Sequence, residues 1–142
     1  MSTEANKVVA RRYFDEFLNQ GKGVVGEDLF APTYRCHFPG NPGSLDKQEH
    51  DDITISFYSA FPDARFTVED TIAEGDKVVS RYTMRGTHQG TWISGTPPTG
   101  KQVTITGNEI HRIADGRIVE QWSEFDFLGT LRQFGVVTAP GQ

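Results

Sequence analysis

The residues with the clearest chemical potential lie near the end of the sequence, around Asp126. This acid stands between Phe125, Phe127 and Leu128, where a strand is predicted to run into a short C-terminal helix. A carboxylate among apolar neighbours is costly unless it is exposed, paired or used. If it is desolvated, its pKa rises and it becomes suited to proton transfer near neutral pH. The alternative is that Asp126 lies at the surface and caps the following helix. The residues leave both interpretations open.

More ionisable residues lie on the two strands that precede this junction. Asp115-Gly116 is typical of a two-residue hairpin turn, which fixes the register of the strands if they contain no bulge. His111 then faces Glu120, and Glu109 faces Trp122. We expect the more apolar side of this hairpin to meet the helices. That side carries Val103, Ile105, Gly107, Glu109, His111, Ile113, Ile118, Glu120, Trp122, Glu124 and Asp126, and the other side carries Thr104, Thr106, Asn108, Arg112, Gln121 and Ser123.

Each of these polar residues also has a structural interpretation. His111 and Glu120 could form an exposed cross-strand pair near the hairpin tip. Glu109 could be a pocket acid or part of a buried polar contact, and Trp122 could belong to the core or form a ligand platform. Gly107 could make room for a ligand or mark a bulge. A bulge would reverse the facing of every residue beyond it.

The remaining histidines and the single cysteine give weaker signals. His37 precedes a loop and could look into the mouth of a cavity, whereas His50 has acidic neighbours that indicate a solvated helix face. Cys36 and His37 are adjacent on an extended segment, so they should point to opposite faces. We expect no metal site, because no two histidines have the His-x-x-x-His spacing and no thiol joins such a pair. It also lacks a Gly-rich phosphate loop.

Composition limits the classes of protein to which the chain could belong. Its 142 residues are the size of one domain, so we expect a single domain over residues 1–142. The net charge of −5 argues against nucleic acid and anionic membrane surfaces. Ten Phe, four Tyr and two Trp suit a thick core or an apolar cavity. With one cysteine and no apolar leader at the N-terminus, we expect a cytoplasmic protein.

The order of the predicted elements indicates an α+β protein. Helices are predicted first, over residues 3–20, 24–30 and 46–61, with residues 34–38 extended. Strands follow over residues 65–73, 78–88, 101–113 and 117–127, and residues 89–100 form an irregular loop. Long antiparallel strands after helices predict a sheet that curls around the helices and encloses a pocket.

This order resembles the NTF2-like fold, a bent cone of mostly antiparallel sheet wrapped by about three N-terminal helices and a short C-terminal helix. Several motifs resemble the SnoaL-like polyketide cyclases in particular, over roughly residues 5 to 135. These motifs are Arg11-Arg-Tyr-Phe, Ala60-Phe-Pro-Asp63, Glu74-Gly-Asp76, Arg85-Gly-Thr-His-Gln-Gly90, Pro97-Pro-Thr-Gly-Lys101, Arg112-Ile-Ala-Asp-Gly-Arg-Ile118 and Asp126-Phe-Leu-Gly-Thr-Leu-Arg-Gln-Phe-Gly135.

The resemblance implies a cofactor-independent intramolecular aldol reaction that closes the last ring of an aromatic polyketide. In such cyclases the Asp before the Phe-x-Gly ending acts as acid and base, and Asp126 matches it. The family histidine on the third strand is replaced here by Glu109, with His111 two residues later. Either His111 takes over that role, or the donor is lost and the chemistry differs. Similar proteins in the same pathways act in hydroxylation.

We therefore expect an enzyme that acts on a small hydrophobic, polycyclic substrate, with Asp126 and His111 as catalytic residues. The residues expected to bind the substrate are Tyr13, His37, Phe57, Glu109 and Trp122. The alternatives are a hydroxylase of the same family and a non-catalytic binding or dimerisation module, in which Asp126 only caps the helix. An epoxide-opening hydrolase would need an Asp–Arg–Asp group that the sequence does not reveal. The outer sheet face predicts a homodimer or homotetramer.

Overall fold

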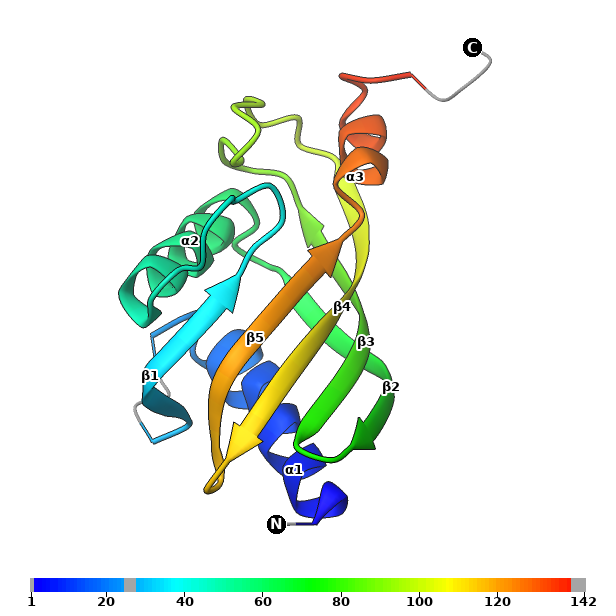
Figure 1. Ribbon diagram of the computed structural model, residues 1–142. Coiled ribbons are helices and arrows are strands. Elements are labelled where there is room, and N and C mark those ends of the chain that lie inside the picture. The colour runs from blue at the N-terminus through cyan, green and yellow to red at the C-terminus, as the bar shows by residue number, and fades with distance from the viewer. Residues whose placement is uncertain (1, 25–27, 139–142) are drawn as a thin grey trace.

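The computed structural model describes residues 2–24 and 28–138 and has one curved sheet with helices on its concave side (Figure 1). The predicted α+β class is confirmed. The elements in chain order are α1 (Thr3–Arg12), the π-helix η1 (Tyr13–Gln20), β1 (Phe30–His37), α2 (Lys47–Ala60), β2 (Arg65–Glu74), β3 (Lys77–Thr87), β4 (Gln102–Ala114), β5 (Arg117–Phe125) and α3 (Phe127–Phe134).

The sheet has five strands in the order β1-β5-β4-β3-β2, and it does not close into a barrel. β1 pairs with β5 in parallel, and every other neighbouring pair is antiparallel. Figure 1 shows α1 lying across the concave side of the sheet, α2 beside β1, and α3 following the end of β5.

Local chemistry explains where the helices begin. Ser2 caps α1 by accepting a hydrogen bond from the Ala5 amide. The α2 helix begins with a capping box, in which Asp46 and Glu49 exchange bonds with each other's backbone amides. The predicted helix over residues 24–30 is wrong at its described residues, because Asp28 and Leu29 form a turn and β1 begins at Phe30. Residues 25–27 lie outside the described residues.

A bulge near the β4–β5 hairpin changes the predicted register. The turn itself is confirmed: Asp115 and Gly116 both have positive φ, at 52° and 76°. However, the register shifts between Arg112 and Ile113, so Glu109 pairs with Ser123 and His111 pairs with Gln121. The predicted pairing of Glu109 with Trp122 is therefore wrong.

This shift reverses the facing of β5 beyond the bulge and leaves β4 as predicted. Gln121 and Ser123, which were expected on the outer side, are buried at the inner face, at 0% and 5% exposure. Glu120, Trp122 and Glu124 alternate with them and lie on the outer face, so their predicted inward placement is wrong. One extra residue thus decides which β5 side chains meet the helices.

Candidate active site

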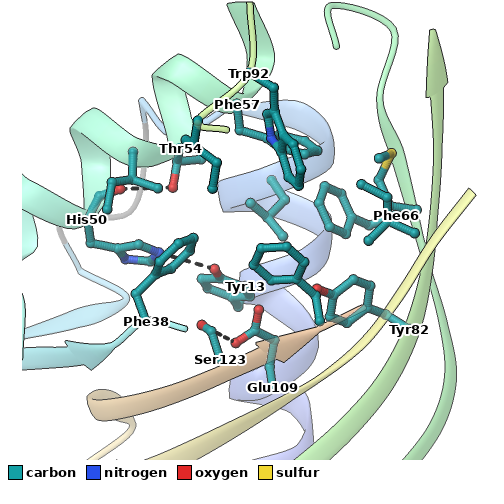
Figure 2. Close-up of a pocket in the computed structure, with 16 residues that line it drawn as sticks. Tyr13, Phe38, His50, Thr54, Phe57, Phe66, Tyr82, Trp92, Glu109 and Ser123 are labelled. Atoms are coloured by element: carbon teal, nitrogen blue, oxygen red, sulfur yellow. Dashed lines mark hydrogen bonds between the residues drawn. The ribbon is translucent and has the colours of Figure 1, made fainter. Parts of the chain in front are cut away.

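A cavity lies between η1, α2 and the inner face of the sheet (Figure 2). Its volume of about 80 Å³ is several times what one water needs, so it can admit part of a ligand. The apolar part of its wall is formed by Leu18, Phe38, Ile53, Phe57, Phe66, Met84, Trp92, Ile93, Ile105 and Phe125. The polar residues of the wall are Tyr13, His50, Thr54, Tyr82, Glu109 and Ser123. Such a lining suits a mostly apolar ligand with a few polar groups.

Glu109 is the acid of this cavity. Its side chain rises from β4 and is 6% exposed. The Ser123 hydroxyl donates to Glu109 Oε2 at 2.7 Å, and among the described residues no other group bonds this carboxyl. Burial raises the pKa of Glu109 to about 8, the Ser123 hydrogen bond opposes that rise, and the charge of Glu124 adds to it. A carboxyl with such a pKa can both give and take a proton near neutral pH.

Behind Glu109, buried polar side chains form a continuous hydrogen-bond network. The Gln121 Nε2 lies 2.8 Å from Ser123 Oγ and 3.1 Å from the Tyr13 hydroxyl. The Gln121 Oε1 lies 2.7 Å from His111 Nε2. Burial lowers the pKa of His111 to about 4, so this imidazole is neutral at physiological pH. His111 does not line the cavity, and its contacts are with Gln121 and with the ring of Tyr13, which does line it.

His50 closes the network on the opposite side of Tyr13. The Tyr13 hydroxyl lies 3.4 Å from His50 Nε2, and the Tyr34 hydroxyl lies 3.0 Å from His50 Nδ1. Burial lowers the pKa of His50 to about 3. The prediction that His50 lies on a solvated helix face is wrong, because its side chain is buried and faces the cavity from α2 together with Thr54 and Phe57. Figure 2 shows the His50 ring pointing from α2 toward Tyr13.

Tyr82 provides a second phenol beside the acid. An added Cβ at Gly107 would lie 2.6 Å from the Tyr82 hydroxyl oxygen, so this glycine makes room for a protein side chain. Burial raises the pKa of Tyr82, and the charge of Glu109 raises it further. Within residues 2–24 and 28–138, no group bonds the Tyr82 hydroxyl. Its O–H is thus available to a ligand in the cavity.

Asp126 lies outside the cavity, at the junction between β5 and α3. Its side chain is exposed and caps α3, with Oδ1 accepting from the Gly129 amide at 2.8 Å. Its backbone amide donates to the Thr106 carbonyl at 2.9 Å, which fixes the junction to β4. The residue that the sequence offered as acid/base therefore occupies the alternative place, the N-cap of a helix.

His37 and Trp122 also lie away from the cavity, on the outer face of the sheet. Their rings stack at 5.2 Å with an interplanar angle of 7°, and His37 Nε2 lies 2.7 Å from Glu120 Oε2. The expectation that these two residues line the pocket is wrong. His37 faces outward because its neighbour on β1, Cys36, faces inward, and Trp122 faces outward because of the bulge in β5. Of the predicted site residues, the structure brings Tyr13, Phe57 and Glu109 together on the cavity wall.

Four site residues were missed by the sequence analysis: Ser123, Gln121, His50 and Tyr82. His50 had a usable signal, since it precedes Ile53 and Phe57 at helical spacing. Tyr82 lies on a strand whose alternation points it inward with Met84. Ser123 and Gln121 had no such signal, because their facing depends on the bulge.

In the described part of the chain, no cluster of three or more His, Cys, Asp or Glu side chains could hold a metal ion. Within residues 2–24 and 28–138, every helix is too short or too polar to cross a bilayer.

Comparison with known proteins identifies the family. The sequence matches the SnoaL-like polyketide cyclase family over residues 8–134. A search of curated proteins returns no match. The chain belongs to the SnoaL-like polyketide cyclase family, as its motifs predicted.

Solved structures confirm the NTF2-like fold. A candidate SnoaL-like polyketide cyclase from Jannaschia sp. CCS1 is 23% identical with a TM-score of 0.84, over 95% of this chain and 94% of that one. IdmH, a candidate polyketide cyclase from Streptomyces antibioticus, is 31% identical with a TM-score of 0.80, over 92% and 98%. AclR, a candidate hydroxylase from Streptomyces galilaeus, is 25% identical with a TM-score of 0.82, over 96% and 99%.

Proposed function

We propose that this protein catalyses an intramolecular aldol-type ring closure in an apolar, polyketide-like substrate, with Glu109 as acid and base. One observation carries the proposal: Glu109 lies buried on the wall of an apolar cavity, where desolvation raises its pKa to about 8. Membership of the SnoaL-like polyketide cyclase family supports the substrate class. Glu109 thus takes the role that the sequence had suggested for Asp126.

The proposed reaction uses one proton twice. Ionised Glu109 removes a proton from a carbon between two carbonyl groups, which leaves an enolate. The enolate carbon attacks a second carbonyl carbon of the same molecule, so that a C–C bond forms and the C=O π bond breaks. The resulting alkoxide takes the proton back from Glu109. Atoms and electrons balance within the substrate and this carboxyl, and the apolar wall holds the two reacting carbons together.

Two features of the cavity favour this chemistry. Burial makes ionised Glu109 a stronger base than an exposed carboxylate, because water no longer stabilises its charge. The Tyr82 hydroxyl, which nothing else bonds among the described residues, can donate to the oxygen on which enolate charge develops. The aromatic wall of Phe57, Phe66 and Trp92 suits a flat, ring-containing substrate.

The test compares two acids with matched substitutions. Glu109→Gln keeps the shape of the side chain and removes the base, so we expect ring closure to fall by about 100-fold or more. Asp126→Asn keeps a good helix cap and should retain most of the activity. The assay uses candidate anthracycline-type intermediates, with folding checked by thermal melt. A folded Glu109→Gln variant with full activity, or a folded Asp126→Asn variant without activity, would contradict the proposal.

The pH dependence gives an independent check on the acid. The reaction needs ionised Glu109 in the free enzyme, so kcat/KM should rise with pH and level off above about 8. A profile already flat between pH 5 and pH 8 would be expected from an acid with an ordinary pKa, and it would exclude Glu109 as the base.

A second candidate function is hydroxylation of the same class of substrate, which the likeness to AclR favours. The two reactions differ in the mass of the product. Ring closure leaves the mass unchanged or lowers it by one water, whereas hydroxylation adds one oxygen atom. Mass spectrometry of the product formed by the wild-type protein therefore separates them.

A further inference from the structure

Four polar side chains form a single row along the inner face of β4 and β5. His111 and Gln121 form one cross-strand pair of this sheet. Glu109 and Ser123 form another, two residues away along each strand and therefore on the same face. Hydrogen bonds of 2.7, 2.8 and 2.7 Å link His111 to Gln121, Gln121 to Ser123, and Ser123 to Glu109. All four are buried, with exposures of 6% or less. The row connects a histidine that cannot reach a ligand with the acid that can.

The direction of this row depends on which end of the Gln121 amide faces His111. In the structure the amide oxygen faces His111 Nε2, and the NH₂ group faces Ser123 and Tyr13. An amide oxygen only accepts, so His111 must carry its hydrogen on Nε2. The His111 Nδ1, which is buried without a partner in the described structure, is then a bare lone pair.

The reversed amide would be less favourable for a physical reason. His111 Nε2 would then have to accept from the Gln121 NH₂ group, and its hydrogen would move to Nδ1. That N–H would be buried without an acceptor, which costs about 1–3 kcal/mol. Cys36 Sγ, which lies 3.8 Å from the Gln121 Nε2, would also lose its donor. The contacts of His111 therefore select the orientation that the structure has.

This orientation fixes the hydrogen of Ser123. Since Gln121 donates to Ser123 Oγ, the Ser123 O–H must point elsewhere, and Glu109 Oε2 is its acceptor at 2.7 Å. When Glu109 is protonated, the Ser123 O–H can keep donating to Oε2 without a clash between two hydrogens if the proton sits on Oε1, which makes no bond among the described residues. Figure 2 shows this second oxygen pointing into the cavity.

We propose that His111 and Gln121 are positioning residues that, through Ser123, hold the proton of Glu109 on the carboxyl oxygen facing the cavity. The inference rests on the proposed role of Glu109 as acid and base. It gives His111 a function without contact to the substrate. The His111 Nε2–H fixes the orientation of the Gln121 amide, and that amide fixes the direction of the Ser123 O–H. The Ser123 O–H in turn fixes which oxygen of Glu109 carries the proton. Proton return to the alkoxide then needs no rotation of the carboxyl group.

The first test reads the histidine directly and needs no substrate. Nitrogen-15 NMR of histidine-labelled wild-type protein distinguishes a protonated ring nitrogen from an unprotonated one. We expect His111 to be neutral at pH 7, with its hydrogen on Nε2. A hydrogen on Nδ1 would overturn the proposal, because Gln121 would then have to accept from Ser123. This result does not depend on whether Glu109 is catalytic.

The second test is a double-mutant cycle between Gln121 and Ser123. Gln121→Met keeps the length of the side chain and removes the donors, so we expect kcat to fall roughly tenfold while KM stays within about twofold. In a Ser123→Ala background the same change should cause no further loss, because the hydroxyl that transmits it is absent. An undiminished loss in that background would overturn the role of Ser123 in the row.

A matched control comes from a buried hydroxyl outside the network. Thr130→Val removes a hydroxyl in α3 that bonds only the Asp126 carbonyl and has no contact with the row, so kcat and its pH profile should stay as in the wild type. An equal loss in this variant would assign the effect of Gln121→Met to general loosening of the core and would overturn the proposal. Full activity of Glu109→Gln beside an Nε2–H His111 would instead reject the proposed function and leave the hydrogen-bond direction intact.

Discussion

Glu109 and Asp126 are both acids with apolar residues close by in the sequence, but the fold buries the first and leaves the second exposed. Glu109 lies in the middle of β4 at the inner face, buried and bonded by one hydroxyl. Asp126 lies beyond the last residue of β5, exposed, and its carboxylate caps a helix. Apolar neighbours in sequence therefore say little about desolvation. A strand places neighbouring residues on opposite faces, and only one face of this sheet meets the helices.

The glycines beside the two acids sharpen this comparison, and Gly107→Ala should have the largest effect on stability. Its Cβ would lie 2.5 Å from the Glu124 carbonyl and 2.6 Å from the Tyr82 hydroxyl, so strand and phenol would both have to move. We expect a loss of about 3 kcal/mol in the free energy of unfolding, measured by urea denaturation.

Gly129→Ala is the matched change beside Asp126. There the added Cβ would meet mainly the Asp126 carboxylate, which can turn into solvent. The loss of the cap, about 1 kcal/mol, is offset by the higher helix propensity of alanine, which is about 1 kcal/mol. Equal losses for Gly107→Ala and Gly129→Ala would contradict the contrast between a packed and an open environment.

The pH dependence of stability should show a second effect of the inner acid. The pKa of Glu109 is about 8 in the folded protein against an ordinary 4.5, so between these values the folded state holds a proton that the unfolded state has released. Stability must then fall as pH rises, by about 1.4 kcal/mol per pH unit. From pH 6.5 to 8 we expect a loss of about 2 kcal/mol, which Glu109→Gln should remove.

Two buried histidines should cause stability to change in the opposite direction below about pH 6.5. The pKa values of His50 and His111 fall to about 3 and about 4 in the fold, so below about pH 6.5 only the unfolded state takes up their protons. Stability therefore falls as pH falls, and the maximum should lie near pH 6.5. Urea denaturation from pH 5 to 9 tests both limbs, and a wild-type curve that still rises from pH 6.5 to 8 would rule out a buried, protonated Glu109.

Substitutions at the outer acid should have the smallest effects. Asp126→Ala removes the bond to the Gly129 amide and should lower the free energy of unfolding by about 1 kcal/mol. Asp126→Asn and Asp126→Ser should restore most of that loss, because both side chains cap helices well. Thermal melts of the three variants measure the difference. A loss in Asp126→Asn as large as in Asp126→Ala would show that the charge matters beyond the cap.

Much of the fold followed from local pattern. The Asp115-Gly116 turn, the alternation of β4, the capped helix α2 and the family motifs led to the right class, the right hairpin and the right family. The facing of β4 was also right, so Glu109 was placed inward. The substrate, the independence from cofactors and the self-association of the outer face stay predictions.

The site could be predicted only in part, and its errors on β5 share one cause. The bulge lies in β5, where Val119 is the extra residue opposite Arg112 and Ile113, and no glycine or proline marks it. It nevertheless places Ser123 and Gln121 at the inner face in place of Trp122 and Glu120. His50 was misplaced by its acidic sequence neighbours, although its spacing to Phe57 matched the buried stripe of α2.

The sequence by itself determined most of the elements, the hairpin turn and the presence of an acid on the inner side of β4, since these depend on residues close together in the chain. The tertiary structure decided which acid is desolvated and which side chains surround it. Desolvation depends on the helices that cover the sheet, and hydrogen-bond direction depends on partners as far apart in sequence as Tyr13 and Gln121. Both are set only when η1, α2 and the bulged hairpin pack together, and that packing made Glu109 the buried acid of this protein.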